Sequence, residues 1–87
     1  MVRYTVLRRE PLVAELANLW ATYHNRSELT AAVDRIDVAL SVDAHTKGNV
    51  FRLGQRTISS GPVAVFFRVD EADRKVTVED ILLTESN

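Results

Sequence analysis

The chain has 87 residues, of which 46% are hydrophobic and 26% charged, with a formal net charge of −1 and no cysteine. This length allows one domain over residues 1–87 and excludes enzymes built on a β/α barrel or a dinucleotide-binding sheet. The missing cysteines exclude disulfide bonds and cysteine-ligated zinc, and the loop residue His45 has no second ligand at metal-binding spacing, so we expect no metal and no cofactor.

The first two predicted elements are a strand and a helix. Residues 3–8 alternate, with Tyr4 and Val6 on one face, which is typical of a strand. From Pro11 onward the apolar residues recur at helical spacing, and proline suits the first turn of a helix because its missing N–H would have no partner there. This pattern predicts an amphipathic helix over residues 10–24.

A second amphipathic helix is predicted over residues 27–42. Ser27 is a suitable N-cap, and Leu29 opens an apolar series that repeats at helical spacing up to Leu40. Only a short polar link separates the two helices, so we expect them to lie side by side as a hairpin.

Three strands joined by short turns are predicted in the second half of the chain. They cover residues 50–58, 63–69 and 76–82. The middle one is apolar on both faces, which is typical of a central strand, and Asp80 interrupts the alternation of the last. The order β-α-α-β-β-β predicts an α+β fold in which the helical hairpin packs on one face of a small, mostly antiparallel sheet. The partner of the first strand stays open.

Positive charge is concentrated in one segment. No acidic residue occurs between residues 44 and 69, and the basic ones are Lys47, Arg52, Arg56 and Arg68. If no bulge intervenes, Arg52 and Arg56 share a face, and Arg68 lies on the same side of its strand as Ala64 and Phe66. We therefore predict an open basic face that contacts phosphate or an acidic partner. The alternative is a set of ordinary solvated arginines that pair with nearby acids.

Aromatic and histidine side chains add two further candidates. Phe66 is expected beside Arg68 on the uncovered face, where its ring can stack on nucleic-acid bases. The other aromatic residues, Phe51 among them, stand at spacings that favour the core. Histidine is a common general acid or base, but a single histidine in a loop is more often inert, so no role is assigned to His45.

Four segments of the chain follow the order and spacing of a known family. They are residues 4–6, the helical runs 12–20 and 31–40, and above all residues 54–78. In the last segment, Arg56 precedes an apolar position, Gly61 stands at a hairpin, and a hydrophobic strand ends in Arg68 and an acidic turn. Together these segments resemble the RelE/ParE superfamily, the toxins of bacterial type II toxin–antitoxin pairs. The resemblance implies the fold predicted above and a cognate antitoxin as partner.

The resemblance also implies a chemistry for the uncovered sheet face. In the ribosome-dependent branch, this face binds mRNA and cleaves it, which needs a proton acceptor, a proton donor and cations beside the phosphate. Arg56 and Arg68 match two basic positions of that site. Ala64, however, stands where a phosphate-binding arginine is common, and the acidic tail at residues 82–87 lacks the usual basic residues, histidine or tyrosine. The catalytic residues therefore remain unassigned.

Two hypotheses follow for a toxin of this type. The first is a ribosome-dependent mRNA endoribonuclease with an incomplete catalytic set. Its predicted nucleic-acid or phosphate contacts are Lys47, Arg52, Arg56, Phe66 and Arg68. The second is a non-catalytic binder, either a toxin directed at DNA gyrase or a degenerate toxin that only pairs with its antitoxin. Because no apolar stretch approaches the roughly 20 residues of a membrane span, we expect a cytoplasmic protein that contacts no membrane.

Overall fold

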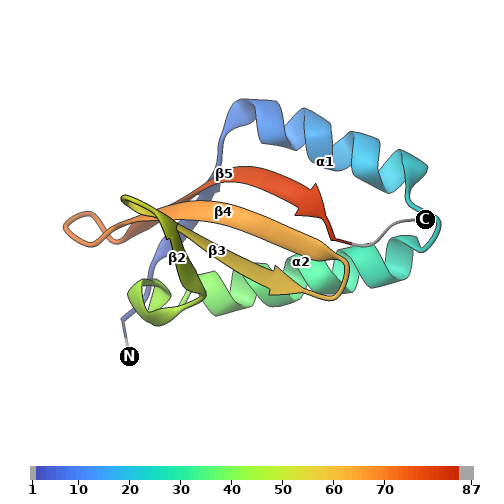
Figure 1. Cartoon of the computed structure of the whole chain (residues 1–87). Helices are drawn as coiled ribbons and strands as arrows, with labels where there is room; N and C mark the ends of the chain where they lie inside the picture. The colour runs from blue at the N-terminus through green and yellow to red at the C-terminus, as the bar shows by residue number, and fades with distance from the viewer. Residues whose placement is uncertain (1, 85–87) are drawn as a thin grey trace.

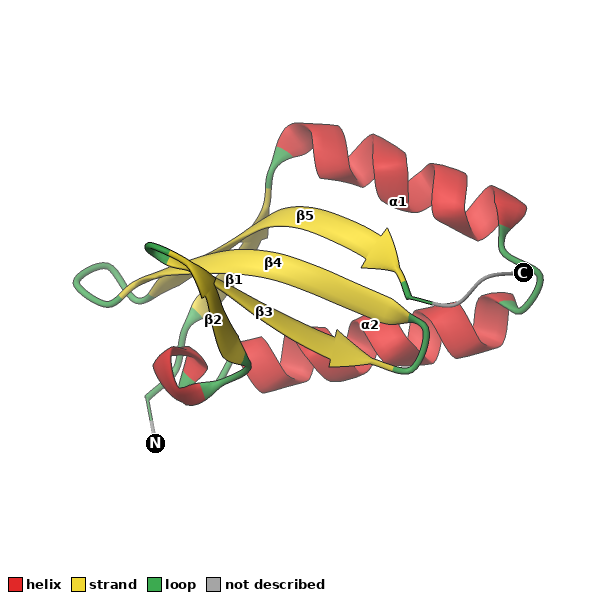
Figure 2. Ribbon diagram, in the orientation of Figure 1, coloured by secondary structure: helices red, strands yellow, loops and turns green. Residues whose placement is uncertain are grey.

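Two helices lie on one side of a five-stranded sheet in the computed structural model, which describes residues 2–84 (Figures 1 and 2). The elements are β1 (Thr5–Arg8), α1 (Glu10–Thr22), α2 (Arg26–Leu40), the short 3₁₀ helix η1 (Ala44–Thr46), β2 (Asn49–Arg52), β3 (Gln55–Ser60), β4 (Val63–Asp70) and β5 (Lys75–Leu83). Neither helix of this described part has the length and apolarity needed to cross a membrane. The predicted α+β class, with a helical hairpin on one face of a mostly antiparallel sheet, is confirmed.

The strand order is β1-β5-β4-β3-β2. Strands β2 to β5 form an antiparallel meander, and β1 returns to pair in parallel with β5. The pairing that the sequence left open is therefore between the two ends of the chain. This pairing places β4 at the centre of the sheet and leaves β2 as an edge strand.

The prediction of a single strand over residues 50–58 is wrong. The chain reverses at Leu53 and Gly54, so this segment forms two strands, β2 and β3. Gly54 has φ +75°, a left-handed conformation that glycine adopts without steric cost. A Cβ at this position would also lie 2.6 Å from Nη1 of Arg68, so a side chain here would displace the end of that arginine.

The helices begin and end close to the predicted residues, with one correction. Asn25, not Ser27, caps α2: its side-chain oxygen accepts a hydrogen bond from the backbone N–H of Glu28 at 3.0 Å. Asparagine caps as well as serine does, and Asn25 stands two residues closer to the end of α1. The indole N–H of Trp20 in α1 donates to the hydroxyl of Thr30 in α2 at 2.9 Å, which ties the two helices together.

The core lies between the helices and one face of the sheet. Three alternate residues of β4 are buried in it, namely Val63, Val65 and Phe67. The helices supply the apolar side chains that cover this face, chiefly Leu12, Leu16, Leu29, Val33, Ile36 and Leu40. Because side chains alternate along a strand, the residues between the buried ones must point to the opposite face.

Replacing Phe67 by alanine tests how far the fold depends on the centre of β4. Phe67 is 0% exposed, so Phe67→Ala leaves a cavity and should lower the free energy of unfolding by about 3–5 kcal/mol. Leu53 at the β2–β3 turn is 96% exposed, and Leu53→Ala should change it by less than about 0.5 kcal/mol. Urea denaturation of both variants measures the difference, and equal losses would contradict this account of the core.

Candidate functional site

The face of the sheet turned away from the helices, here called the open face, carries the even-numbered residues of β4. Ala64, Phe66 and Arg68 lie on it between the buried positions, which confirms the orientation predicted for them. A hollow in this face is lined by Arg9, Phe51, Arg52, Gln55, Phe66, Arg68, Glu79, Asp80 and Leu82. Residues from four strands therefore meet here, together with Arg9, which follows β1.

Two aromatic rings form the apolar part of the hollow. The rings of Phe51 and Phe66 are 4.7 Å apart between centroids and meet edge to face at 65°. The guanidinium carbon of Arg52 lies 4.7 Å from the centroid of the Phe51 ring, within cation–π range. Phe51 was expected in the core, but it is 49% exposed, because β2 is an edge strand with no helix over it.

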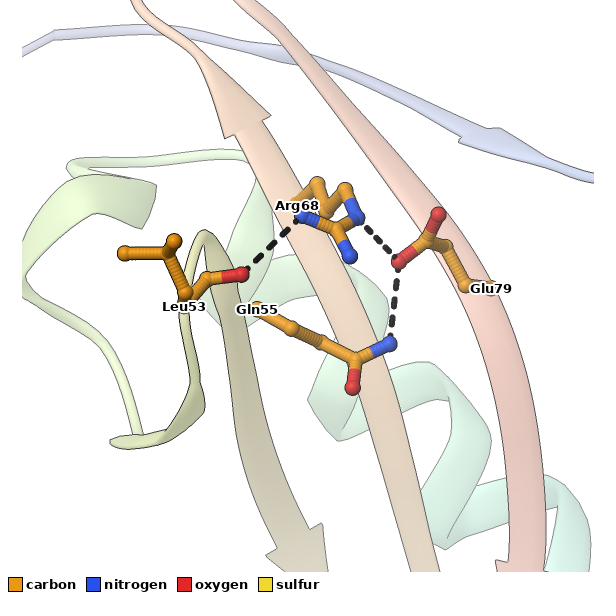
Figure 3. A network of polar contacts seen from close by, with 4 residues as sticks. All are labelled: Leu53, Gln55, Arg68 and Glu79. Atoms are coloured by element: carbon orange, nitrogen blue, oxygen red, sulfur yellow. Dashed lines mark hydrogen bonds and ion pairs between the residues drawn. The ribbon is translucent and has the colours of Figure 1, made fainter.

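Arg68 is the centre of a polar network that joins three strands and a turn (Figure 3). Its Nε donates to Oε1 of Glu79 in β5 at 2.7 Å, and the side-chain amide of Gln55 in β3 donates to the same oxygen at 2.9 Å. Nη1 of Arg68 also makes a long contact of 3.4 Å with the carbonyl oxygen of Leu53. These contacts hold the guanidinium at a defined position on the open face.

A β-bulge in β5 places two acidic side chains beside the arginines. Phe66 pairs with Asp80 while the next residue, Phe67, pairs with Val78, so Glu79 is the extra residue. The bulge turns both Glu79 and Asp80 towards the hollow and returns Ile81 to the core side. Regular alternation would instead have pointed the Asp80 carboxylate at the helices, where burial of its charge is costly.

Arg56 does not line the open-face hollow with Arg52 and Arg68, so the predicted common face is wrong for this residue, although it lines a second hollow beside Arg52. It pairs with Phe67, and directly opposed residues share a face, so its side chain lies on the helix side of the sheet. There its Nε donates to the carbonyl of Lys47 at 2.8 Å and its Nη2 to that of Gly48 at 3.2 Å. The reason is the reversal at Leu53 and Gly54, which breaks the parity that connected Arg52 with Arg56.

The other predicted positions are divided between the two sides. Ala64 lies on the open face opposite Ser59 of β3. Lys47 is half-buried, and its carbonyl holds Arg56. His45 shares a hydrogen bond of 2.9 Å between its Nδ1 and the hydroxyl of Tyr4, outside the open-face hollow. Of the acidic tail, Leu82 lines the hollow, whereas residues 85–87 lie outside the described part of the chain.

The hollow has mixed charge, and the pairing of Arg68 with Glu79 agrees with the alternative in which the arginines pair with nearby acids. Three arginines line it, but β5 contributes two carboxylates, so it is less basic than residues 44–69 by themselves suggest. Sequence reasoning missed Arg9, Phe51, Gln55, Glu79 and Asp80. The one signal that pointed to the acidic pair was the interruption of alternation at Asp80, which the bulge explains.

The side chains that line the hollow are better suited to binding an anionic ligand than to transferring protons. The arginines supply N–H donors for an anion, and the rings supply faces for stacking. The two carboxylates can accept a proton, but neither histidine of the chain lines the hollow. His24 follows α1, where its ring lies 4.6 Å from that of Tyr23.

Comparison with known proteins identifies the fold. No protein-family model and no curated protein matches the sequence. Among solved structures, a chain of the toxin–antitoxin complex RelBE2 from Mycobacterium tuberculosis superposes with a TM-score of 0.78, covering 98% of this chain and 97% of that one at 21% identity. The RelE-like α+β fold expected from the sequence is thus confirmed over almost the whole chain.

Arg56→Ala should affect stability, because its hydrogen bonds hold the segment before β2. We expect the free energy of unfolding to fall by about 1–2 kcal/mol, as for hydrogen bonds from a charged group that is only partly buried. Arg68→Ala removes a half-exposed ion pair, so its loss should stay below about 1 kcal/mol. Urea denaturation of both variants provides the comparison, and a larger loss for Arg68→Ala would contradict the structural role given to Arg56.

Proposed function

We propose that this chain is the toxin component of a type II toxin–antitoxin module. Two independent observations support the proposal. The fold matches a chain of a toxin–antitoxin complex over 98% of its length, and the motif order of the sequence resembles the RelE/ParE toxins. The superposition covers 98% of the chain, and the four segments of the resemblance lie within residues 4–78.

A cognate antitoxin is the first partner in this proposal. Residues 44–69 carry no acid, and the edge strand β2 and the turn after it expose large apolar side chains, with Val50 at 71% and Leu53 at 96%. An antitoxin segment with acidic and apolar residues would cover this surface and neutralise its arginines. Such cover would also stabilise a small domain with a limited core.

The target of the free toxin, in this proposal, is single-stranded nucleic acid on the open face. The observation that carries it is the meeting of cations and aromatic rings in one hollow, where Arg52 and Arg68 lie beside Phe51 and Phe66. Aromatic rings that stack on bases, with arginines beside the backbone, are the usual means of binding single strands. Ribosome-bound mRNA fits this chemistry.

A second candidate is a non-catalytic toxin, and two observations favour it over an efficient endoribonuclease. Ala64 offers no cation on the open face, and Arg56 is held on the other side of the sheet. Loss of one preorganised donor typically lowers a rate by about 10²–10³. A chain with this set would act by binding, either on DNA gyrase or only on its antitoxin.

Induction of the protein without its genomic neighbour separates these candidates. We expect growth arrest that the adjacent reading frame relieves, because an antitoxin would cover the toxic surface. Transcripts cut at fixed codon positions would identify an endoribonuclease, and DNA damage with intact transcripts a gyrase-directed toxin. Absence of arrest would leave only the degenerate toxin and contradict a toxic activity.

The same assay tests the open face. The double variant Arg52→Ala, Arg68→Ala should relieve the arrest, because it removes two cations from the hollow. A matched control, Arg3→Ala with Arg26→Ala, removes the same charge at exposed positions that do not line it. Arrest that persists in the first pair, or is relieved equally by both pairs, would exclude the hollow as the site.

A further inference from the structure

We infer that Glu79 limits how strongly the open face binds phosphate, because its carboxylate holds the Arg68 guanidinium as a counter-ion. This inference rests on the proposed contact between the open face and nucleic acid. It assigns Glu79 as a positioning residue that acts through Arg68. The argument depends on the geometry of the pair, on its partial exposure and on the neighbouring carboxylate of Asp80.

The donors of Arg68 are only partly used. A guanidinium has five N–H donors, and two of its nitrogens are engaged: Nε with Glu79 at 2.7 Å and Nη1 with the Leu53 carbonyl at 3.4 Å. Nη2 has no hydrogen bond among residues 2–84. Figure 3 shows the guanidinium between the β2–β3 turn and β5, so its remaining donors keep one orientation. Arg68 is therefore both oriented for an anion and already beside one.

The charge of Glu79 opposes any incoming phosphate. The side chain of Arg68 is 47% exposed and that of Glu79 is 21% exposed, so a ligand in the hollow reaches the guanidinium while the carboxylate stays beside it. Opposite charges at this distance cancel much of each other's field beyond a few ångströms. A phosphate consequently gains the hydrogen bonds of Arg68 but little long-range attraction.

The fold keeps Glu79 in this position. Its Oε1 accepts hydrogen bonds from Arg68 and from Gln55, which come from two different strands. Withdrawal of the carboxylate would break both bonds at once. The counter-charge is thus a fixed part of the hollow and is not displaced by rotation of one exposed side chain.

The bulge supplies a matched control for this inference. Asp80 carries the same charge, follows Glu79 directly and lines the same hollow. Its Oδ1 accepts from the backbone N–H of Ile81 at 2.9 Å, and none of the salt bridges of residues 2–84 includes it. Removal of charge at the two positions therefore distinguishes an effect through Arg68 from a general electrostatic one.

The test is binding of a fluorescent single-stranded oligouridine, followed by anisotropy at several salt concentrations. Glu79→Gln keeps a side-chain oxygen as acceptor and removes the charge, so affinity should rise about three- to five-fold at low salt. The slope of log affinity against log salt should steepen by about 0.7, the value for one more effective phosphate contact with a single strand. Asp80→Asn should raise affinity by less than about two-fold.

Combination with Arg68→Ala decides whether the effect passes through the arginine. In that background Glu79→Gln should no longer tighten binding, because the guanidinium that it releases is absent. Equal gains from Glu79→Gln and Asp80→Asn, no gain from Glu79→Gln, or a gain that survives Arg68→Ala would each overturn the inference.

Folding and the proposed function are checked separately. Urea denaturation should show that Glu79→Gln is folded, and if it is not, Glu79→Asp shortens the carboxylate and should tighten binding to a smaller extent. Wild-type binding that Arg68→Ala weakens but Glu79→Gln leaves unchanged would overturn only the role of Glu79. Lack of binding by the wild type and by Glu79→Gln would contradict both that role and the proposed nucleic-acid contact.

Discussion

The pleat of β4 is the constraint on which the rest of the structure depends. Phe67 and the alternate residues before it must face the helices, because Phe67 is the largest of the fully buried side chains in residues 2–84. Phe66 and Arg68 must then face away from the helices. A shift of register by one residue would exchange the two sets, so burial on one side of the sheet determines which side chains form the hollow on the other.

Two local departures from regular strands decide the content of that hollow. The reversal at Gly54 brings β2 back along β3, which adds Phe51 and Arg52 to the open face and sends Arg56 to the other side. The bulge in β5 adds two acids and keeps Ile81 in the core. The result is a surface in which Arg52 lies beside an aromatic ring and Arg68 beside a carboxylate. Such a surface favours a ligand with matching groups over polyanions in general.

In this arrangement one arginine, Arg56, contributes to stability, and another, Arg68, faces the proposed binding surface. Arg56 stabilises the segment before β2 through hydrogen bonds to backbone carbonyls. Arg68 donates a hydrogen bond to Glu79 through Nε, and its other donors point towards the hollow. Both residues match basic positions of the motif that the chain resembles, yet only Arg68 lines the open-face hollow. A motif match therefore identifies positions in a strand, and the orientation of each position depends on the sheet around it.

The sequence by itself determined both helices, the central strand and the side of β4 on which Phe66 and Arg68 lie. Those features follow from the spacing of apolar residues within one segment, which is a local property. Only the tertiary structure decided the parallel pairing of β1 with β5, the turn at Gly54 and the meeting of Arg68 with Glu79. These depend on the hydrogen-bond register between segments far apart in the chain, and no local periodicity specifies that register.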